Sequence, residues 1–421
     1  MDLSVQAANR IEGTVKAPPS KSYTHRAFLM AFLAEGESLI RDPLYSEDTL
    51  ASLNSCMALG SRVLKTKSQC RILGIGGKPN TPEDVLDLKN SGTTLRIMTS
   101  IASLTDGYTV LTGDESLKTR PMQDLLDALK PLGVSAYSTK NDGKPPIIVK
   151  GGFNGGETSI KGNVSSQFIS SIIMAAPYSK NPVDLHVEGE FISRPYVEMT
   201  LNLMNKFGVN VDYDRNEKSF HIEPQTYKPI DYTVEGDYSS ASYIIAAAAC
   251  LESDITIKNL MKDSKQGDKL ILDIIGEMGC EVKVKNNEVK IKGHGILNGV
   301  DVNLQNAPDL LPTVAALAAM ADGTTNIDGV EHARFKETDR IHTCSTELAK
   351  LGVSLTEKKD GIKIEGGVHG GVVKSHRDHR LAMAFYIIGL KVGGICIKDA
   401  SVYNVSFPDF PDIMKKLTAG F

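Results

Sequence analysis

Apolar, alanine-rich segments recur about every 70 residues along the chain, and each follows a short polar or glycine-containing start. The segments read RAFLMAFLAEG, LRIMTSIASLTDG, FISSIIMAAP, ASYIIAAAACL, LLPTVAALAAMADG and HRLAMAFYIIGL. Their starts lie at Ser22, Thr93, Ser166, Ser240, Asp309 and Asp378. The pattern predicts six copies of one helix.

A second set of elements follows most of these segments. Runs of β-branched residues such as DITIKNL, TTNIDGV and ICIKDA predict strands, and turn signals at Asn286-Asn287 and Asp360-Gly361 predict hairpins. Apolar runs that end in leucine or methionine before glycine, such as LLDALKPLGV and ELAKLGV, predict a second helix. The predicted fold class is therefore α/β, built from six repeats of a helix–strand–helix–strand unit.

The repeats divide the chain into two domains of three units each. The segment EPQTYKPIDYTVEGD holds two prolines and few apolar residues, as expected of a crossing between domains. One N-terminal strand from Leu3 to Val15 is left over, and we expect it to complete the second domain. The expected domains are residues 16–230 and a discontinuous domain of residues 1–15 and 231–421, with a cleft between them.

The starts of the six helices favour binding of an anion. Ser, Thr, Gly and Asp cap helix N-termini, which carry partial positive charge. Basic residues gather at several of these starts, namely Lys21, Arg26, Arg96 and Arg380. The chain as a whole has a net charge of −4, so this positive charge is local, and a nucleic-acid partner is not expected. The pattern favours a small anionic ligand.

Composition indicates an enzyme of the cytoplasm rather than a membrane or secreted protein. The longest apolar runs fall short of the roughly 20 residues that a membrane span needs, and no signal-like segment opens the chain. Six cysteines are scattered without CxxC spacing, which favours reduced thiols, although an even number is also compatible with disulfides.

Seven ordered motifs give the chain a family resemblance. PPSKSYTHRAFLMAFLAEG, NSGTTLRI, ESLKTRPM, VSSQFISSI, EGDYSSASY, FKETDRI and DHRLAMAF together resemble the 5-enolpyruvylshikimate-3-phosphate synthase family. The resemblance implies a two-domain inverse α/β barrel with helix N-termini facing the cleft. It also implies transfer of the enolpyruvyl group of phosphoenolpyruvate to the 5-hydroxyl of shikimate 3-phosphate, with release of phosphate. No cofactor or metal is implied, and a monomer is expected.

The same resemblance implies a set of site residues. Phosphoenolpyruvate would be bound by Lys21, Gly92, Arg120, Gln167, Arg340 and Arg380. Shikimate 3-phosphate would be bound by Lys21, Ser22, Arg26, Ser165, Ser166, Gln167, Ser193, Asp309 and Lys336. Proton transfer would fall to Asp309, Glu337 and Lys21, with Asp309 acting on the 5-hydroxyl and Glu337 on the methylene carbon. Arginine suits two substrates that each carry a phosphate and a carboxylate, because its planar fork pairs with either group.

Each of these residues also has a simpler structural interpretation. The serine pair in VSSQ could only cap a helix, and Asp309 could cap the helix that begins LLPTV. Arg340 could be a surface charge paired with Glu337, worth under about 1 kcal/mol. HRDHR resembles a metal-binding cluster but lacks a third well-spaced ligand group.

The chain also departs from the family pattern. Val405 stands where many members carry lysine, His332 where several carry asparagine, and Ile97 where proline is common.

Two rival functions remain at this stage. One is the enolpyruvyl transferase that acts on UDP-N-acetylglucosamine, which usually has a cysteine in the loop corresponding to residues 112–120; this loop has none. The other is a non-catalytic anion-binding scaffold.

Overall fold

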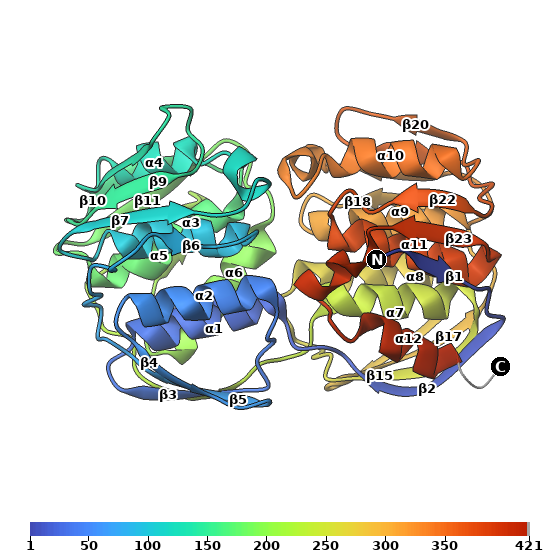
Figure 1. Cartoon of the computed structure of the whole chain (residues 1–421), viewed down its shortest axis with the longest axis horizontal. Coiled ribbons are helices and arrows are strands. Elements are labelled where there is room, and N and C mark those ends of the chain that lie inside the picture. Colours follow the sequence, from blue (N-terminus) through green and yellow to red (C-terminus); the bar gives the residue numbers. More distant parts are fainter. Residues whose placement is uncertain (419–421) are drawn as a thin grey trace. The chain divides into compact units, whose positions relative to one another are not determined.

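The computed structural model describes residues 1–418, which form two compact units. Unit 1 comprises Met1–Ser20 and Glu235–Phe421, and unit 2 comprises Lys21–Val234 (Figure 1). The chain therefore passes from one unit to the other after Ser20 and again after Val234, a few residues beyond the boundaries expected from the sequence. Each unit has its own hydrophobic core.

Two families of helices alternate along the chain. The first helix of each repeat is, in order, α1 (Lys21–Leu33), α3 (Gly92–Ala102), α5 (Ser166–Ala175), α7 (Tyr238–Cys250), α9 (Leu311–Ala319) and α11 (His379–Val392). The second helices are α2 (Glu47–Ala58), α4 (Gln123–Leu129), α6 (Arg194–Lys206), α8 (Ile271–Glu277), α10 (Arg340–Lys350) and α12 (Phe410–Thr418). All six alanine-rich segments are thus helical, as predicted.

The strands of unit 2 form three four-stranded sheets, ordered β14-β3-β5-β4, β6-β7-β9-β8 and β10-β11-β13-β12. In each sheet the first two strands are parallel and the others antiparallel. The strands are β3 (Glu37–Arg41), β4 (Arg62–Lys65), β5 (Gln69–Leu73), β6 (Leu86–Asp87), β7 (Tyr108–Thr112), β8 (Ser135–Ser138), β9 (Ile147–Lys150), β10 (Gly156–Lys161), β11 (Val183–Glu188), β12 (Asp212–Asp214), β13 (Ser219–Ile222) and β14 (Asp231–Thr233).

Unit 1 repeats this arrangement in the sheets β2-β15-β17-β16 and β18-β19-β21-β20, and adds a three-stranded sheet, β1-β23-β22. The strands are β1 (Leu3–Val5), β2 (Arg10–Lys16), β15 (Glu252–Lys258), β16 (Glu281–Lys285), β17 (Glu288–His294), β18 (Asp301–Asn303), β19 (Thr325–Asp328), β20 (Leu355–Glu357), β21 (Ile362–Ile364), β22 (Gly371–Lys374) and β23 (Ile395–Lys398). Within residues 1–418 the six sheets are open, and hydrogen bonds close none of them into a barrel.

Two strands are exchanged between repeats. β2 precedes α1 in the sequence, but it pairs in parallel with β15 of unit 1, with Arg10 opposite Glu252. β14 precedes α7, but it pairs in parallel with β3 of unit 2, with Asp231 opposite Leu39. Each unit therefore completes one of its sheets with a strand whose own repeat lies in the other unit.

The prediction of one N-terminal strand from Leu3 to Val15 is wrong. The segment forms β1 and β2, which pair in two different sheets. Between them the amide of Ala8 donates to the carbonyl of Leu390 at 2.8 Å, so the backbone leaves the ladder there. The residues between the strands, QAAN, lack the alternation that would have kept a single strand in one sheet.

Burial explains the alanine-rich composition of the first helices. Every residue of α7 is buried, so this helix is surrounded by protein on all sides, and small side chains let its neighbours approach. The strands instead alternate, as in β15, where buried residues stand between more exposed ones. The first helices of the repeats thus form the inside of each unit, and their N-termini become the places where polar chemistry can be positioned. None of the helices in the described part of the chain has the length and apolar character of a membrane crossing.

Candidate functional site

A cluster of charges surrounds Arg340, the first residue of α10. Its Nε donates to Asp378 at 2.8 Å, its Nη1 donates to Asp309 at 2.8 Å, and its Nη2 donates to Glu337. Arg380, at the start of α11, donates to the other oxygen of Asp309 at 2.9 Å. Lys336 completes the set, 3.5 Å from Asp309. We call these six residues the arginine cluster, and it lies entirely within unit 1.

Charge compensation keeps Arg340 ionised despite its burial. Only 1% of the residue is exposed, and burial acts to lower its pKa. Coulombic attraction from Asp378, Glu337 and Asp309 outweighs burial, so the net effect is a raised pKa. Asp378 is fully buried, so this arginine is also what makes the burial of that carboxylate tolerable.

The structure excludes two of the simpler interpretations. Asp309 does not cap α9, because it lies in the short 3₁₀ helix Pro308–Leu310, and the residue at the N-cap of α9 is Leu310, which makes no side-chain cap. Arg340 does pair with Glu337, but it is buried and not a surface charge. Asp378, predicted as a helix start and also part of HRDHR, caps α11 by accepting from the backbone amide of Arg380 at 2.9 Å.

In unit 2, Lys21 is the first residue of α1 and is paired with a carboxylate. Its Nζ donates to Asp48 at 2.8 Å, and both side chains are mostly buried. Asp48 lies in the first turn of α2, where the partial positive charge of the helix also favours a carboxylate. The sequence reasoning did not find Asp48, and the nearest signal was its place just after Ser46 at a helix start.

Arg26 lies five residues after Lys21 in α1 and is 1% exposed. Its guanidinium donates to the hydroxyl of Thr200 at 2.7 Å and to the carbonyls of Ser22 and Tyr196, both at 3.0 Å. Burial lowers its pKa to about 10. The structure therefore places this predicted ligand-binding residue among neutral acceptors of its own unit, with Ser22 one helical turn before it.

Gly92 and Arg120 adjoin each other near the start of α3. A Cβ on Gly92 would lie 2.5 Å from Nη1 of Arg120 and 3.4 Å from Nη1 of Arg96. Arg120 follows the short 3₁₀ helix Leu117–Thr119, and its Nη2 donates to Asn90 at 2.7 Å. A side chain at position 92 would force the guanidinium of Arg120 to shift, so the glycine and this arginine conformation belong together.

Gln167 joins α5 to α3. Its side-chain Nε2 donates to the hydroxyl of Thr93 at 2.9 Å, and its side-chain Oε1 accepts from Nη1 of Arg96 at 2.5 Å. Ser165 accepts from the amide of Gln167 at 3.3 Å, so it does cap α5, as its simpler interpretation held. Ser166 begins α5 and is buried.

Ser193 stands at the N-cap of α6 with φ 53° and ψ 31°, in the left-handed region. A non-glycine residue there is uncommon, and such backbone often marks a functional site.

Of the predicted site residues, unit 2 holds Lys21, Ser22, Arg26, Gly92, Arg120, Ser165, Ser166, Gln167 and Ser193, and unit 1 holds Asp309, Lys336, Glu337, Arg340 and Arg380. Within each unit they lie at or near helix N-termini.

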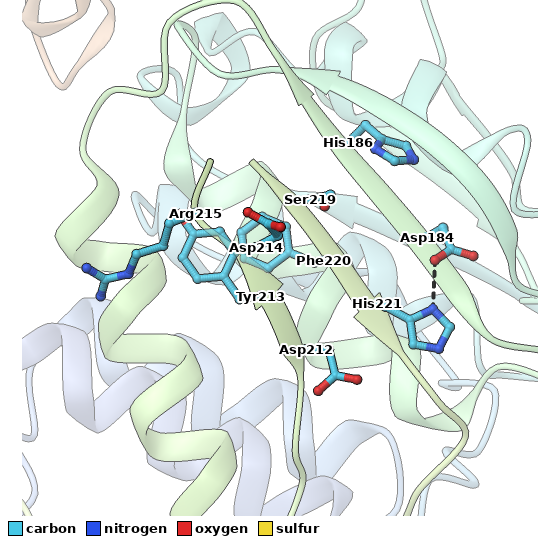
Figure 2. A pocket seen from close by; sticks show the side chains of 9 residues that line it. All are labelled: Asp184, His186, Asp212, Tyr213, Asp214, Arg215, Ser219, Phe220 and His221. Atoms are coloured by element: carbon cyan, nitrogen blue, oxygen red, sulfur yellow. Dashed lines mark hydrogen bonds and ion pairs between the residues drawn. The ribbon is translucent and has the colours of Figure 1, made fainter. Parts of the chain in front are cut away.

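A pocket of about 530 Å³ lies elsewhere on unit 2, lined by strands β11, β12 and β13 (Figure 2). His221 contacts Asp184 at 2.7 Å there, and the rings of Tyr213 and Phe220 are stacked with centroids 4.4 Å apart. None of the predicted site residues lines this pocket. The size of a hollow is therefore not what identifies the candidate site in this protein.

Comparisons with known proteins decide the family. The model of the family EPSP synthase (3-phosphoshikimate 1-carboxyvinyltransferase) matches residues 5–414. The chain belongs to the EPSP synthase family. It is 61% identical over 417 residues to the 3-phosphoshikimate 1-carboxyvinyltransferase of Methanothermobacter thermautotrophicus, covering 99% of this chain and 98% of the relative. It is 56% identical over 424 residues to the protein of that name from Methanosphaera stadtmanae, covering 99% and 100%.

Solved structures agree with this family and its two-domain fold. The EPSP synthase from Acinetobacter baumannii superposes with a TM-score of 0.84 at 26% identity, covering 99% of this chain and 98% of the other. The enolpyruvyl transferase NikO from Streptomyces tendae reaches a TM-score of 0.78 at 17% identity, over 98% and 96%, which shows a shared fold. The predicted fold class and the resemblance are therefore confirmed, and the protein is a transferase.

Two departures from the family pattern have a structural setting. His332, in the 3₁₀ helix Glu331–Phe335, is largely buried; burial, reinforced by the nearby charge of Lys336, lowers its pKa to about 4. It is therefore a neutral imidazole beside the arginine cluster.

Val405 ends the 3₁₀ helix Ala400–Val405, and Lys398 is paired with Asp2 at 2.6 Å. Lys398 is thus engaged elsewhere, as its distance in sequence from Val405 suggested.

Within the described residues, no group of three His, Cys, Asp or Glu side chains is placed to hold a metal ion. His376 and His379 of the HRDHR motif are used differently: His376 contacts Glu347 at 2.6 Å, and His379 is the buried first residue of α11.

Proposed function

We propose that the predicted site residues act in the enolpyruvyl transfer of the EPSP synthase family. The reaction moves the enolpyruvyl group of phosphoenolpyruvate to the 5-hydroxyl of shikimate 3-phosphate and releases phosphate. One observation carries the proposal. Carboxylates and arginines that the family resemblance assigned to catalysis and binding form one buried network, in which Asp309 contacts both Arg340 and Arg380.

Arg120, Arg340 and Arg380 would hold the two anionic groups of phosphoenolpyruvate, with Gly92, Lys21 and Gln167 completing that site. Two substrates dense in negative charge repel each other unless fixed cations neutralise them. All three arginines are at most 6% exposed, so their charges act in a poorly solvated environment. The guanidinium of Arg120 lies directly against the backbone of Gly92, which supports a role for both residues in one site.

Shikimate 3-phosphate would be bound chiefly by unit 2. Ser165, Ser166 and Ser193 stand at the starts of α5 and α6, where hydroxyls and helix N-termini together suit a phosphate. Lys21, Ser22, Arg26 and Gln167 would contact the rest of the molecule, and Asp309 and Lys336 are assigned to the same substrate. The low pKa of buried Arg26 supports a role for it, since a bound anion would restore the stability of its charged form.

The proton transfers follow from addition and elimination. Carbon 3 of phosphoenolpyruvate takes a proton while the 5-hydroxyl oxygen, losing its own proton, bonds to carbon 2. The intermediate then returns a proton from carbon 3 as the bond from carbon 2 to the phosphate oxygen breaks. We assign the hydroxyl proton to Asp309 and the methylene proton to Glu337, with Lys21 as a third proton carrier. Both carboxylates are 16% exposed and accept from the same guanidinium, which orients them.

The direct experiment is a phosphate-release assay with phosphoenolpyruvate and either shikimate 3-phosphate or UDP-N-acetylglucosamine. Release only with shikimate 3-phosphate is expected. Release with the sugar nucleotide alone would overturn the proposed acceptor. No release with either acceptor would instead favour a non-catalytic anion-binding scaffold.

We further propose that the enzyme works as a monomer in the cytoplasm. All six cysteines are free thiols, and five of them are buried. Burial raises the pKa of Cys70 and of Cys280 to about 11, which keeps these thiols protonated and slow to oxidise. Such thiols suit a reducing compartment. Light scattering of the purified enzyme, with and without its substrates, tests the monomer.

A further inference from the structure

The segment that leads into α11 has an unusual backbone. His376 and Arg377 are consecutive non-glycine residues with φ of 52° and 59°. This left-handed region is disfavoured for residues with a Cβ, so two in succession persist only when the surrounding structure holds them. The segment lies between β22 and α11 and ends at Asp378, the cap of the helix that carries Arg380.

A buried carboxylate of α10 holds this segment. Glu347 is fully buried and accepts from the imidazole Nε2 of His376 at 2.6 Å. It also accepts from the backbone amide of Lys374 at 3.1 Å and from Nζ of Lys350 at 2.6 Å. Burial acts to raise the pKa of Glu347, but the hydrogen bonds from Lys350 and His376 outweigh it and lower the pKa overall. Glu347 is therefore an anion that holds the segment at Lys374, just before the strained residues, and at His376, the first of them.

Glu347 and Arg340 connect α10 to the segment before α11 through two separate side-chain contacts. They are seven residues apart, which is about two helical turns, so they point from the same face of the helix. Arg340 contacts Asp378, and Glu347 contacts His376, two residues earlier in the same segment. The two contacts fix the segment at both ends relative to α10.

The position of Arg380 depends on this segment. Asp378 accepts from the amide of Arg380 at 2.9 Å and so sets where α11 begins. Arg380 then reaches Asp309 at 2.9 Å and the hydroxyl of Ser239 at 2.5 Å. If the left-handed residues relaxed, the start of α11 and the guanidinium of Arg380 would shift together.

We propose that Glu347, acting through His376, is a positioning residue for phosphoenolpyruvate binding: it holds the strained His376–Arg377 backbone that places Arg380. The inference rests on the proposed role of Arg340 and Arg380 in binding that substrate. Glu347 itself is fully buried and is not assigned to contact either substrate.

The experiment measures KM for both substrates in variants of the full chain. His376→Ala removes the contact with Glu347 from its partly exposed end and should raise KM for phosphoenolpyruvate about tenfold, with KM for shikimate 3-phosphate within about twofold of the parent. His376→Gln keeps a donor and should restore most of the affinity. Glu347→Gln should resemble His376→Ala.

Lys350→Gln is the matched control. It removes the other cation from the same carboxylate, but the side chain of Lys350 donates to Glu347 and not to the strained residues, so both KM values should stay within about twofold of the parent. A tenfold rise in KM for phosphoenolpyruvate in Lys350→Gln would overturn the inference, because it would show that Glu347 matters only as a buried charge.

Arg377→Gly gives a second, independent test, because glycine adopts positive φ without cost. Placed in the His376→Ala background, it should return KM for phosphoenolpyruvate to within about threefold of the parent. Failure of this rescue, or a His376→Ala variant with unchanged KM, would overturn the positioning role. Arg380→Ala separates the two claims. If it leaves KM for phosphoenolpyruvate unchanged, the proposed function fails; if it raises KM while His376→Ala does not, only this inference fails.

Discussion

Arg26 in unit 2 and Arg340 in unit 1 are both 1% exposed, yet the two units hold them in opposite ways. Arg26 donates to a hydroxyl and two backbone carbonyls, and burial lowers its pKa to about 10. For Arg340 burial acts in the same direction, but the carboxylates of Asp378, Glu337 and Asp309 reverse the effect and raise its pKa.

The difference teaches what each unit is suited to do. A guanidinium held by neutral acceptors keeps its charge uncompensated, so an incoming phosphate or carboxylate stabilises it. A guanidinium held by three carboxylates has much of its charge compensated, so besides pairing with a substrate anion it orients those carboxylates. Unit 2 is thus suited to anion binding, and the arginine cluster of unit 1 is suited to proton transfer as well as binding.

The largest expected effect is on turnover. Asp309→Asn and Glu337→Gln should each lower kcat by about two to four powers of ten, because each removes a proton carrier while keeping size and hydrogen-bonding shape. Steady-state phosphate release measures this effect, with circular dichroism as the check on folding. A double variant within a few-fold of the parent would move the proton transfers elsewhere, most directly to Lys21, and would break the contrast between the units.

The next effect is on stability. Arg340→Met should lower the free energy of unfolding by about 3 kcal/mol or more, because it leaves the fully buried Asp378 and its neighbours without their shared cation. Arg26→Met should cost less, about 1–3 kcal/mol, because its partners are neutral. Urea unfolding of both variants at neutral pH compares them. Equal losses would show that the two arginines are held equally strongly after all.

Binding of phosphoenolpyruvate gives a smaller effect. Arg120→Ala and Arg380→Ala should each weaken it by about 2 kcal/mol, roughly thirtyfold, through loss of a charge-assisted pair at a poorly solvated site. Isothermal titration in the presence of shikimate 3-phosphate gives the dissociation constant. Lys350→Gln, which removes a half-exposed lysine that is not assigned to either substrate, is the control and should titrate like the parent. Unchanged binding in both arginine variants would remove them from the site.

The smallest effect concerns His332, the neutral imidazole beside the arginine cluster. Burial lowers the pKa of His332 to about 4, so the folded chain binds this proton less readily than the unfolded chain does. The contribution of neutral His332 to the free energy of unfolding is therefore fully present above about pH 6.5. It is lost as the pH falls from about 6.5 toward 4. His332→Asn should therefore reduce the loss of stability over that range and leave kcat at neutral pH within about twofold. A larger change in kcat would add the imidazole to the proton carriers.

The sequence predicted the helices well because their pattern is local. Alanine-rich runs with polar starts specify a buried helix and its beginning within a dozen residues, so Ser165 at α5 and Asp378 at α11 were recognisable as helix starts. The break in the N-terminal strand was missed because it depends on a distant partner, the carbonyl of Leu390, which no local pattern near Ala8 reveals.

The site was predicted unevenly for the same reason. Arg340 and Glu337 lie in one short motif, so their contact could be anticipated from spacing alone. Asp48 and Glu347 were missed because nothing in their own sequence neighbourhood marks them. Each becomes important only when folding brings it against Lys21 or His376. Residues that support a site through a second side chain leave little trace in a single sequence.

The exchanged strands have a consequence for how the chain matures on the ribosome. Unit 2 is a continuous stretch that ends with β14, so all of its sheets are available once residue 234 has left the exit tunnel. The sheet that contains β2 and β15 cannot form until β15 has been synthesised, much later. Until then β2 has no partner strand, and its exposed backbone groups can pair with a wrong strand. The order of synthesis thus makes unit 2 an early product and unit 1 a late one. A fragment of residues 21–234 should fold alone, whereas residues 235–421 should need the first twenty residues supplied to them.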